Sequence, residues 1–401
     1  MLLQCESVEV EVSFWLTLQK NPYRLFFTLG AVLAFIGITP WALVLINESS
    51  YPRDLHRQIM INGFLLSFVC GFLMTAVPKF TGSFAASKIE LSVIFSTLVL
   101  AAVAIFFLPS FFSYGFAAVA IAALIVFAGK RFARRSSNPP FTFVFIGVGL
   151  LLWFLSNVVQ SLIAGGVELS PGAQEFANGL FTNGALMCLI LGVGGRLIPA
   201  ILGWQDVISH QRERYEKDEP FLAVVPLDVW LAVAVFFLSF VLQPWFSATA
   251  CLLARAVVVL YFGVKYWRVH RPPKARSYLT WSLWLSCWCL IGGYFLSAFW
   301  PEGGVHAMHV LFIGGFSLLT LLISTRVSLA HGGAGPAVEK TSPGILIFTS
   351  ILLLAALTRV TAIVWPRIYR DHLGYAAILW IAGLALWAWT IYSKLRSSEE
   401  G

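Results

Sequence analysis

Residues 91–128 read LSVIFSTLVLAAVAIFFLPSFFSYGFAAVAIAALIVFA and contain no charged side chain. A helix needs about 20 mostly apolar residues to cross the hydrocarbon core of a bilayer, so this stretch is long enough for two crossings. Proline cannot continue a helix, and Pro109 stands between the two apolar halves. We therefore expect a tight hairpin of two transmembrane helices, over 89–108 and 110–128.

The same kind of apolar run recurs along the whole chain. Apolar residues make up 59% of the 401 residues and charged residues only 11%, whereas a soluble domain is about one quarter charged. No linker is long enough to hold a soluble domain. We expect an all-α, polytopic membrane bundle that forms one domain over 1–401, with about twelve transmembrane helices near 25–46, 58–79, 89–108, 110–128, 141–164, 177–202, 221–242, 245–267, 278–299, 305–329, 343–364 and 373–394.

The basic residues predict the orientation of these helices. Of the 27 Lys and Arg, 21 fall near the two termini or in alternate loops, 5 fall in the opposite set of loops, and Arg255 lies within a span. Loops rich in basic residues stay in the cytoplasm. Both termini are therefore expected in the cytoplasm of a bacterial inner membrane. The net charge of +8 is explained by topology, so lipid is the expected partner and nucleic acid is not.

An internal repeat is a further prediction. His56, Asn183 and His309 open the second, sixth and tenth spans, at spacings of 127 and 126 residues. This periodicity would divide the twelve spans into three units of four helices.

Histidines gather at one side of the predicted bundle. His56, His306, His309 and His372 all lie at the outer ends of spans, and imidazole is a good ligand for haem iron, copper and zinc. Such a cluster is what a metal or haem site needs, although a single interfacial His usually only contacts water. His331 follows His309 by 22 residues, which is about 33 Å along a helix, so it belongs to the cytoplasmic end.

Arginines supply the second candidate feature. The outer side carries few basic residues, namely Arg53, Arg57, Arg359, Arg367 and Arg370. Arginine offers planar bidentate donors suited to carboxylates such as haem propionates, while the alternative is an interfacial anchor. Arg196 and Arg326, at cytoplasmic helix ends, are read as anchors in preference to an anion site. Arg255 needs a partner, because an unpaired charge inside a membrane is costly.

Several motifs resemble the NnrS family, bacterial membrane proteins tied to the nitric-oxide and denitrification response. The similar stretches cover most of the chain: Asn21 to Phe27, His56 to Gly63, Gly71 to Pro78, the Gly-Gly-Arg-Leu-Ile-Pro-Ala block at 194–200, and His309 through Arg326 to Gly332. The family pattern WHxHEM is reduced here to Leu55 through Met60, which keep one His and lack the Glu. The resemblance implies a twelve-helix protein with haem and copper, in which His56, His309 and His331 match motif positions.

A second, architectural resemblance is to the twelve-helix subunit of haem–copper oxidases. There a low-spin haem lies between His on helices two and ten, and Arg of the last outer loop bind its propionates. The matching residues here are His56, His309 or the competing His306, and Arg367 with Arg370. The copper-binding His of helices six and seven have no counterpart, which argues against oxygen reduction.

The leading expectation is a haem b protein with His56 and His309 as axial ligands, and with copper as a weaker possibility. Arg57, Arg367 and Arg370 would accompany the cofactor, and His306, His331 and His372 are the other candidate metal ligands. Nitric oxide and an electron-transfer partner would be its partners. The alternatives are a twelve-helix transporter, since broken helices such as that at 192–199 mark transporter sites, and a subunit of a respiratory complex.

Overall fold

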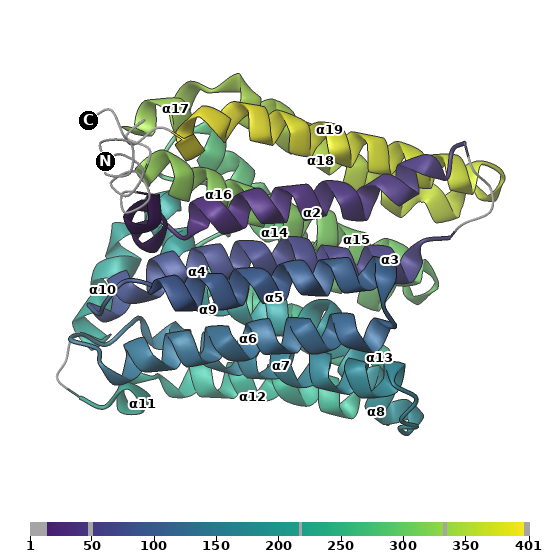
Figure 1. Cartoon of the computed structure of the whole chain (residues 1–401). Helices are drawn as coiled ribbons and strands as arrows, with labels where there is room; N and C mark the ends of the chain where they lie inside the picture. The colour runs from purple at the N-terminus through teal and green to yellow at the C-terminus, as the bar shows by residue number, and fades with distance from the viewer. Residues whose placement is uncertain (1–13, 47–50, 216–218, 332–334, 397–401) are drawn as a thin grey trace, which may run out of the picture.

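The computed structural model describes residues 14–46, 51–215, 219–331 and 335–396, and within these ranges it contains helices and no β-strand. Eleven helices in this part of the chain are long and apolar enough to cross a membrane, and a further apolar helix, Leu227–Leu242, is shorter. The predicted all-α bundle of about twelve spans is therefore confirmed. The helices lie roughly parallel or antiparallel and give the bundle two ends (Figure 1).

The chain divides into three consecutive groups of four helical spans. The first group is α2 (Tyr23–Leu43), the broken helix α3–η1–α4 (Arg53–Gln58, Ile59–Leu65, Leu66–Thr81), α5 (Lys88–Phe107) and α6 (Ser110–Ala133). The second is α7 (Val144–Ala164), α8–η3–α9 (Pro171–Gly179, Leu180–Gly184, Ala185–Leu202), α12 (Leu227–Leu242) and α13 (Ala248–Lys265). The third is α14 (Tyr278–Phe299), α15–η5–α16 (Gly304–His309, Val310–Ser317, Leu318–His331), α18 (Pro343–Thr361) and α19 (Tyr369–Arg396).

The same neighbours pack in each group. The first helix contacts the second, the third contacts the fourth, and the fourth contacts the first helix of the next group, with α19 returning to α2. The second span of each group is also the most buried: 72, 78 and 67% of its apolar window is buried, against at most 61% for every other candidate span. The helices therefore close into a ring around three inner spans, a pattern that supports the predicted threefold repeat.

Each inner span is interrupted by a π-helical segment. These segments are η1, η3 and η5, and each contains at least one glycine. A Cβ on Gly315 would come within 2.6 Å of Leu290 on α14, and one on Gly184 within 3.0 Å of Phe240 on α12. Glycine thus lets a neighbouring helix approach the widened turn. The sequence pattern did not indicate these segments, which are rare and often occur at functional sites.

The seventh span is shorter than predicted. The sequence indicated a helix over 221–242, but a short helix α11 (Phe221–Val224) ends at the extended residue Val225, and α12 begins only at Leu227. Pro226 precedes α12, and proline restricts the residue before it to extended backbone. Between α9 and α11, the loop carries the helix α10 (Gln205–Tyr215).

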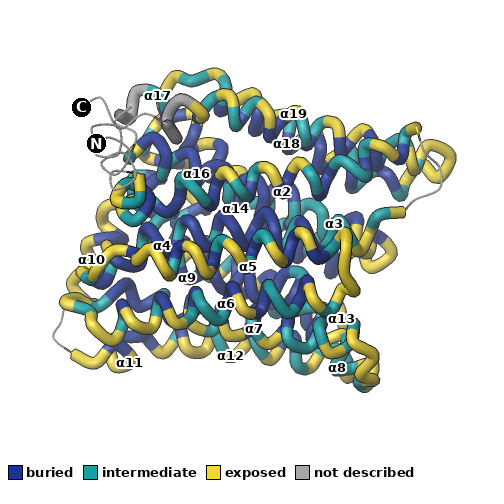
Figure 2. Tube along the Cα trace, in the orientation of Figure 1, coloured by how far each residue is buried: buried dark blue, intermediate teal, exposed yellow. Residues whose placement is uncertain are grey.

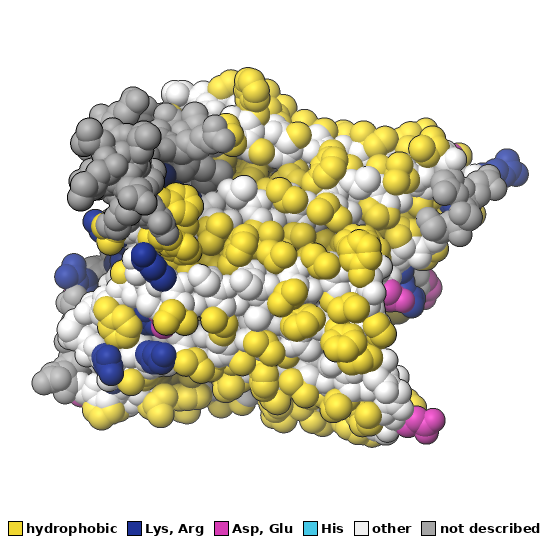
Figure 3. Space-filling model, in the orientation of Figure 1, with side chains coloured by type: hydrophobic (Ala, Val, Ile, Leu, Met, Phe, Trp, Pro, Cys, Tyr) yellow, Lys and Arg dark blue, Asp and Glu magenta, His cyan; other side chains and the backbone are white. Residues whose placement is uncertain are grey.

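The surface has the apolar flank expected of a membrane protein. Buried positions line the interior of the bundle and exposed positions its flank (Figure 2), where the visible side chains are mostly apolar (Figure 3). In the same view the visible Lys and Arg gather mainly at the left end, where α2 begins and α19 ends. The right end carries α3, α8 and α15 and corresponds to the predicted outer side.

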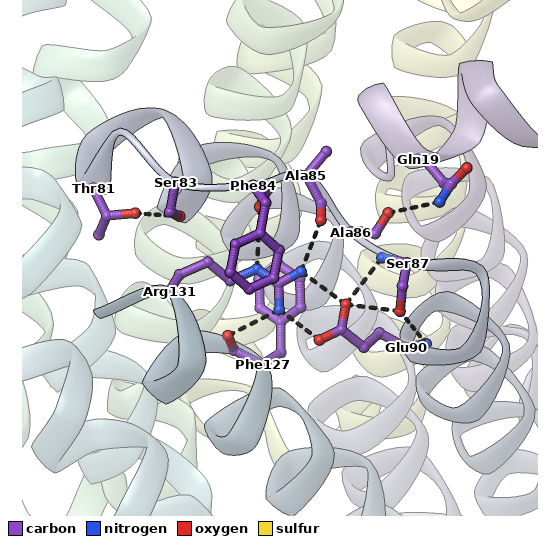
Figure 4. A network of polar contacts seen from close by, with 10 residues as sticks. All are labelled: Gln19, Thr81, Ser83, Phe84, Ala85, Ala86, Ser87, Glu90, Phe127 and Arg131. Atoms are coloured by element: carbon purple, nitrogen blue, oxygen red, sulfur yellow. Dashed lines mark hydrogen bonds and ion pairs between the residues drawn. The ribbon is translucent and has the colours of Figure 1, made fainter. Parts of the chain in front are cut away.

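One buried ion pair closes the turn between α4 and α5 (Figure 4). The fully buried Arg131 of α6 donates from Nη1 and Nη2 to the two carboxylate oxygens of Glu90, at 2.5 and 2.7 Å. Its guanidinium also donates to the backbone carbonyls of Phe84, Ala85 and Phe127. The Phe127 ring centroid lies 3.6 Å from the guanidinium carbon. The guanidinium is therefore fully hydrogen-bonded within the protein, and it fixes the loop between α4 and α5.

Candidate functional site

A cavity of about 710 Å³ lies among the inner spans at the outer end. All three groups of helices contribute to it, including α3 and η1, α8 and η3, and η5, together with α18 and α19. Its size falls in the range of about 300–1,000 Å³ that is usual for small-molecule and cofactor sites. Each inner span presents a polar residue to it just before its π segment, namely His56, Asn178 and His309.

His56 and His309 face this cavity with matching orientations. The Nδ1 atom of His56 lies 2.9 Å from the carbonyl oxygen of Gly37, and that of His309 lies 2.6 Å from the carbonyl oxygen of Val305. A carbonyl can only accept, so Nδ1 carries the proton in both rings and Nε2 keeps its lone pair. This is the arrangement by which proteins orient an imidazole that ligates a metal. Trp41 packs edge-on against His56 and Phe312 against His309, so both rings are held in place.

Arg359 of α18 also lines the cavity, and it is only 9% exposed. Its Nη1 lies 2.5 Å from Nδ1 of His306, which must therefore accept. Among the ion pairs of the described residues, none joins Arg359 to a carboxylate. A buried guanidinium with a neutral partner leaves positive charge at the cavity wall. His306 itself is not a lining residue; it lies behind Arg359 and beside Tyr369.

Arg57 and residues of the second group form a hydrogen-bonded polar wall of the cavity. Arg57 donates from Nη1 to Oδ1 of Asn178 at 3.0 Å and from Nη2 to the hydroxyl of Tyr114 at 3.2 Å. Gln160 donates to the same Asn178 oxygen at 2.8 Å. Sequence reasoning missed Asn178 and Gln160. The repeat pointed instead to Asn183, which lies within η3 and accepts from Tyr294 at 2.9 Å.

The other predicted residues lie away from this cavity. Arg367 and Arg370 are exposed and are not lining residues, so the cavity cations are Arg53, Arg57 and Arg359. His372 packs against Trp365, outside the lining.

His331 lies at the opposite end of the bundle. It bonds to Lys79, and its Nδ1 bonds to the carbonyl of Val327. The glycines that follow it, Gly332 and Gly333, fall outside the described residues. Of the four histidines predicted at the outer side, His56 and His309 line the cavity. His306 bonds to Arg359 behind the lining, and His372 lies away from the cavity. Within the described ranges, no three or more His, Cys, Asp or Glu side chains gather as a metal site.

Two of the unassigned arginines have partners. Arg255, 2% exposed, donates to Ser239 and to the side-chain oxygen of Gln243, and its guanidinium stacks 3.5 Å from the ring centroid of Phe240. Arg326 pairs with Glu339 at 2.5 Å. Both side chains are therefore bonded within the protein, and the anchor interpretation of Arg326 stays a prediction.

In a comparison with protein families, the chain matches the family model described as NnrS protein over residues 17–398, which is nearly the whole chain. No curated protein matches the sequence.

Proposed function

We propose, from the premise that this chain belongs to the NnrS family, that it is a haem-binding protein of the bacterial inner membrane. Family membership makes it an NnrS-like membrane protein of the nitric-oxide response. The observation that carries the haem proposal is the pair of imidazoles, His56 and His309, which line one cavity with Nε2 unprotonated.

The residues present fit a haem b group. Two neutral imidazoles are the ligand set of a six-coordinate haem. Apolar side chains such as Met60, Phe316 and Trp380 line the same cavity and suit the macrocycle. Arg359 offers a buried cation without a carboxylate among the described residues, which suits a propionate. We therefore propose that Arg359, and not the exposed Arg367 and Arg370, pairs with a haem propionate.

The protein's own residues then define what the site can do. A bound haem would supply one-electron redox chemistry, and nitric oxide would bind its iron only in place of one imidazole. His56 and His309 would hold the iron from two helices, and their Nδ1 bonds to backbone carbonyls keep the rings oriented. His306 holds Arg359 against the cavity wall. A site arranged in this way suits electron transfer or ligand sensing, with an outer-side redox partner.

Copper is the alternative occupant of the two imidazoles. Copper sites generally use three or more strong ligands, and the inner span without a cavity histidine, α8–η3–α9, presents the amide of Asn178 instead. We therefore favour haem. Elemental analysis of the purified protein separates the two cases, since haem brings one iron per haem and a pyridine haemochrome spectrum.

The first prediction tests the ligands directly. Purified wild-type protein is expected to show the reduced-minus-oxidised bands of haem b. His56→Ala and His309→Ala should each lower haem occupancy to below about a tenth, because a six-coordinate site loses an axial ligand. His372→Ala is the matched control, since this outer histidine lies outside the cavity, and it should keep full occupancy. Full haem retention in both cavity variants would refute the proposal.

A further inference from the structure

The lining of the cavity contains two kinds of side chains. His56, His309 and apolar residues suit a haem, whereas the polar wall consists of Arg57 with Gln160, Gln174 and Asn178 of the second group. A haem held by the two histidines would not need hydrogen bonds from these amides. The polar wall therefore offers hydrogen-bonding groups to a second ligand.

Asn178 shows which groups the polar wall offers. Its Oδ1 accepts from both Arg57 and Gln160, and arginine can only donate. The orientation of the amide is thus determined, and Nδ2 with its two N–H groups is the part left for the cavity. No bond from this nitrogen is seen within the described part of the chain. Asn178 consequently presents hydrogen-bond donors to a ligand.

Arg57 presents a second donor beside it. Its two terminal nitrogens are held by Asn178 and Tyr114, and Phe181 packs against the guanidinium with a ring centroid 5.5 Å away. Each terminal nitrogen carries two N–H groups and uses one of them on these partners. The Arg57 side chain is 28% exposed, so its remaining terminal N–H groups and its positive charge are open to a ligand oxygen.

The charge of the lining sets the sign of the ligand. Three arginines and one aspartate line the cavity, which with neutral imidazoles gives a net charge of +2. The carboxylate, Asp54, has a side chain that is 67% exposed, and it lies 4.0 Å from Arg57, beyond hydrogen-bonding distance. Positive charge in a site with low-dielectric walls concentrates anions.

We infer that the polar wall binds a small oxyanion, which accepts hydrogen bonds from the remaining terminal N–H groups of Arg57 and from Asn178 Nδ2. A planar monoanion with two coplanar oxygens, such as nitrate or formate, matches the plane of a guanidinium. The site lies beside the proposed haem but does not require it. Tyr114 and Asn178 orient Arg57 before the anion arrives, so little ordering is needed on binding.

The test is isothermal titration of the purified full-length protein with sodium nitrate and with sodium formate. The wild type should bind both. Arg57→Gln removes the cation, and Asn178→Asp places a carboxylate beside Arg57 that occupies the anion's position. Both variants should bind at least tenfold more weakly. Arg367→Gln removes an exposed outer arginine outside the cavity and should bind within twofold of the wild type.

Melting temperatures separate loss of the site from loss of the fold. Asn178→Asp should melt at or above the wild-type temperature, because its new carboxylate pairs with Arg57. Nitrate should raise the melting temperature of the wild type but not of this variant, by linkage. A wild type that binds neither anion, or variants that bind like the wild type, would overturn the inference. Binding that follows the predicted pattern in a protein without haem would refute the proposed function and leave this inference standing.

Discussion

At the residue scale, the buried cations show how the bundle treats charge inside a membrane. Arg131 uses its guanidinium on one carboxylate and three carbonyls, and Arg255 uses hydroxyl, carbonyl and amide oxygens. Arg359 differs, because its partner is an imidazole and no carboxylate of the described chain reaches it. The cation with the least complete set of partners is therefore the one beside the histidines.

Arg131→Gln tests this interpretation of the structural cations. The change leaves Glu90 without its partner in a half-enclosed position, and breaking such a buried pair costs about 3–5 kcal/mol. We expect a lower midpoint in the unfolding of the detergent-solubilised protein. Arg134→Gln is the control, since Arg134 is exposed, and it should change the midpoint little. The double variant Glu90→Gln/Arg131→Gln should recover part of the loss; equal midpoints for all three variants would contradict the role assigned to the pair.

The sequence could predict those site residues whose position depends only on the membrane topology. The count of basic loops places His56 and His309 at one level of the membrane, so the pair was predictable. Rotation about the helix axis decides whether a side chain faces a cavity, and hydropathy says little about it. For that reason Arg359 could not be distinguished from Arg367 and Arg370, and Asn178 was overlooked beside Asn183.

At the element scale, the π segments explain how the inner spans supply the cavity. A π turn adds one residue to the helix and shifts every side chain before it around the axis by about 100°. His56, Asn178 and His309 each stand within three residues of such a segment. The π segments thus determine which way His56, Asn178 and His309 point, relative to the side chains on the other half of the same span.

Deleting Ile61 from η1 should therefore remove the site without removing the span. The deletion restores a regular α-helical turn and rotates His56 away from the cavity. We expect a membrane-inserted protein that binds less than a tenth of the wild-type haem. Ile61→Ala keeps the chain length and should retain haem. The role assigned to η1 is wrong if the deletion variant binds haem as well as Ile61→Ala does.

The sequence could not reveal these segments, because hydropathy is high on every side of the inner spans. A helix that is apolar all round has no periodic pattern of apolar residues. The change from about 3.6 residues per turn in an α-helix to about 4.4 in a π segment therefore cannot be seen in its sequence. The α11–α12 break was missed for a related reason: residues 221–242 are mostly apolar on both sides of the break, and only Pro226 marks the interruption.

At the scale of the whole molecule, the described helices start and finish at the same end of the bundle. α2 begins and α19 ends at the same end of the bundle (Figure 1), as an even number of crossings requires. The loop between α7 and α8 lies at the other end. The basic-residue bias assigns this end to the periplasm, and this assignment stays a prediction.

Cysteine labelling tests the orientation. In a variant without Cys5, Glu168→Cys should react with a membrane-impermeant maleimide in intact spheroplasts. Ser209→Cys on α10 should react only after the cells are broken. Both positions are exposed, so differences in labelling report the side of the membrane. Labelling of Ser209→Cys in intact spheroplasts would reverse the topology and place the cavity on the cytoplasmic side.

The short helix α12 has a consequence for the surrounding lipid. Its 16 residues, Leu227–Leu242, extend about 24 Å at 1.5 Å per residue, whereas the hydrocarbon core is about 30 Å thick. Asp228 at its first turn is held by Lys265, Tyr261 and Tyr266, which fixes a charged cluster near that end. We expect a short span of this kind to be matched by local thinning of the bilayer, by snorkelling of flanking side chains or by association with a partner. Such a hydrophobic mismatch would draw short-chain lipids, or a partner with an equally short span, to this one side of the ring.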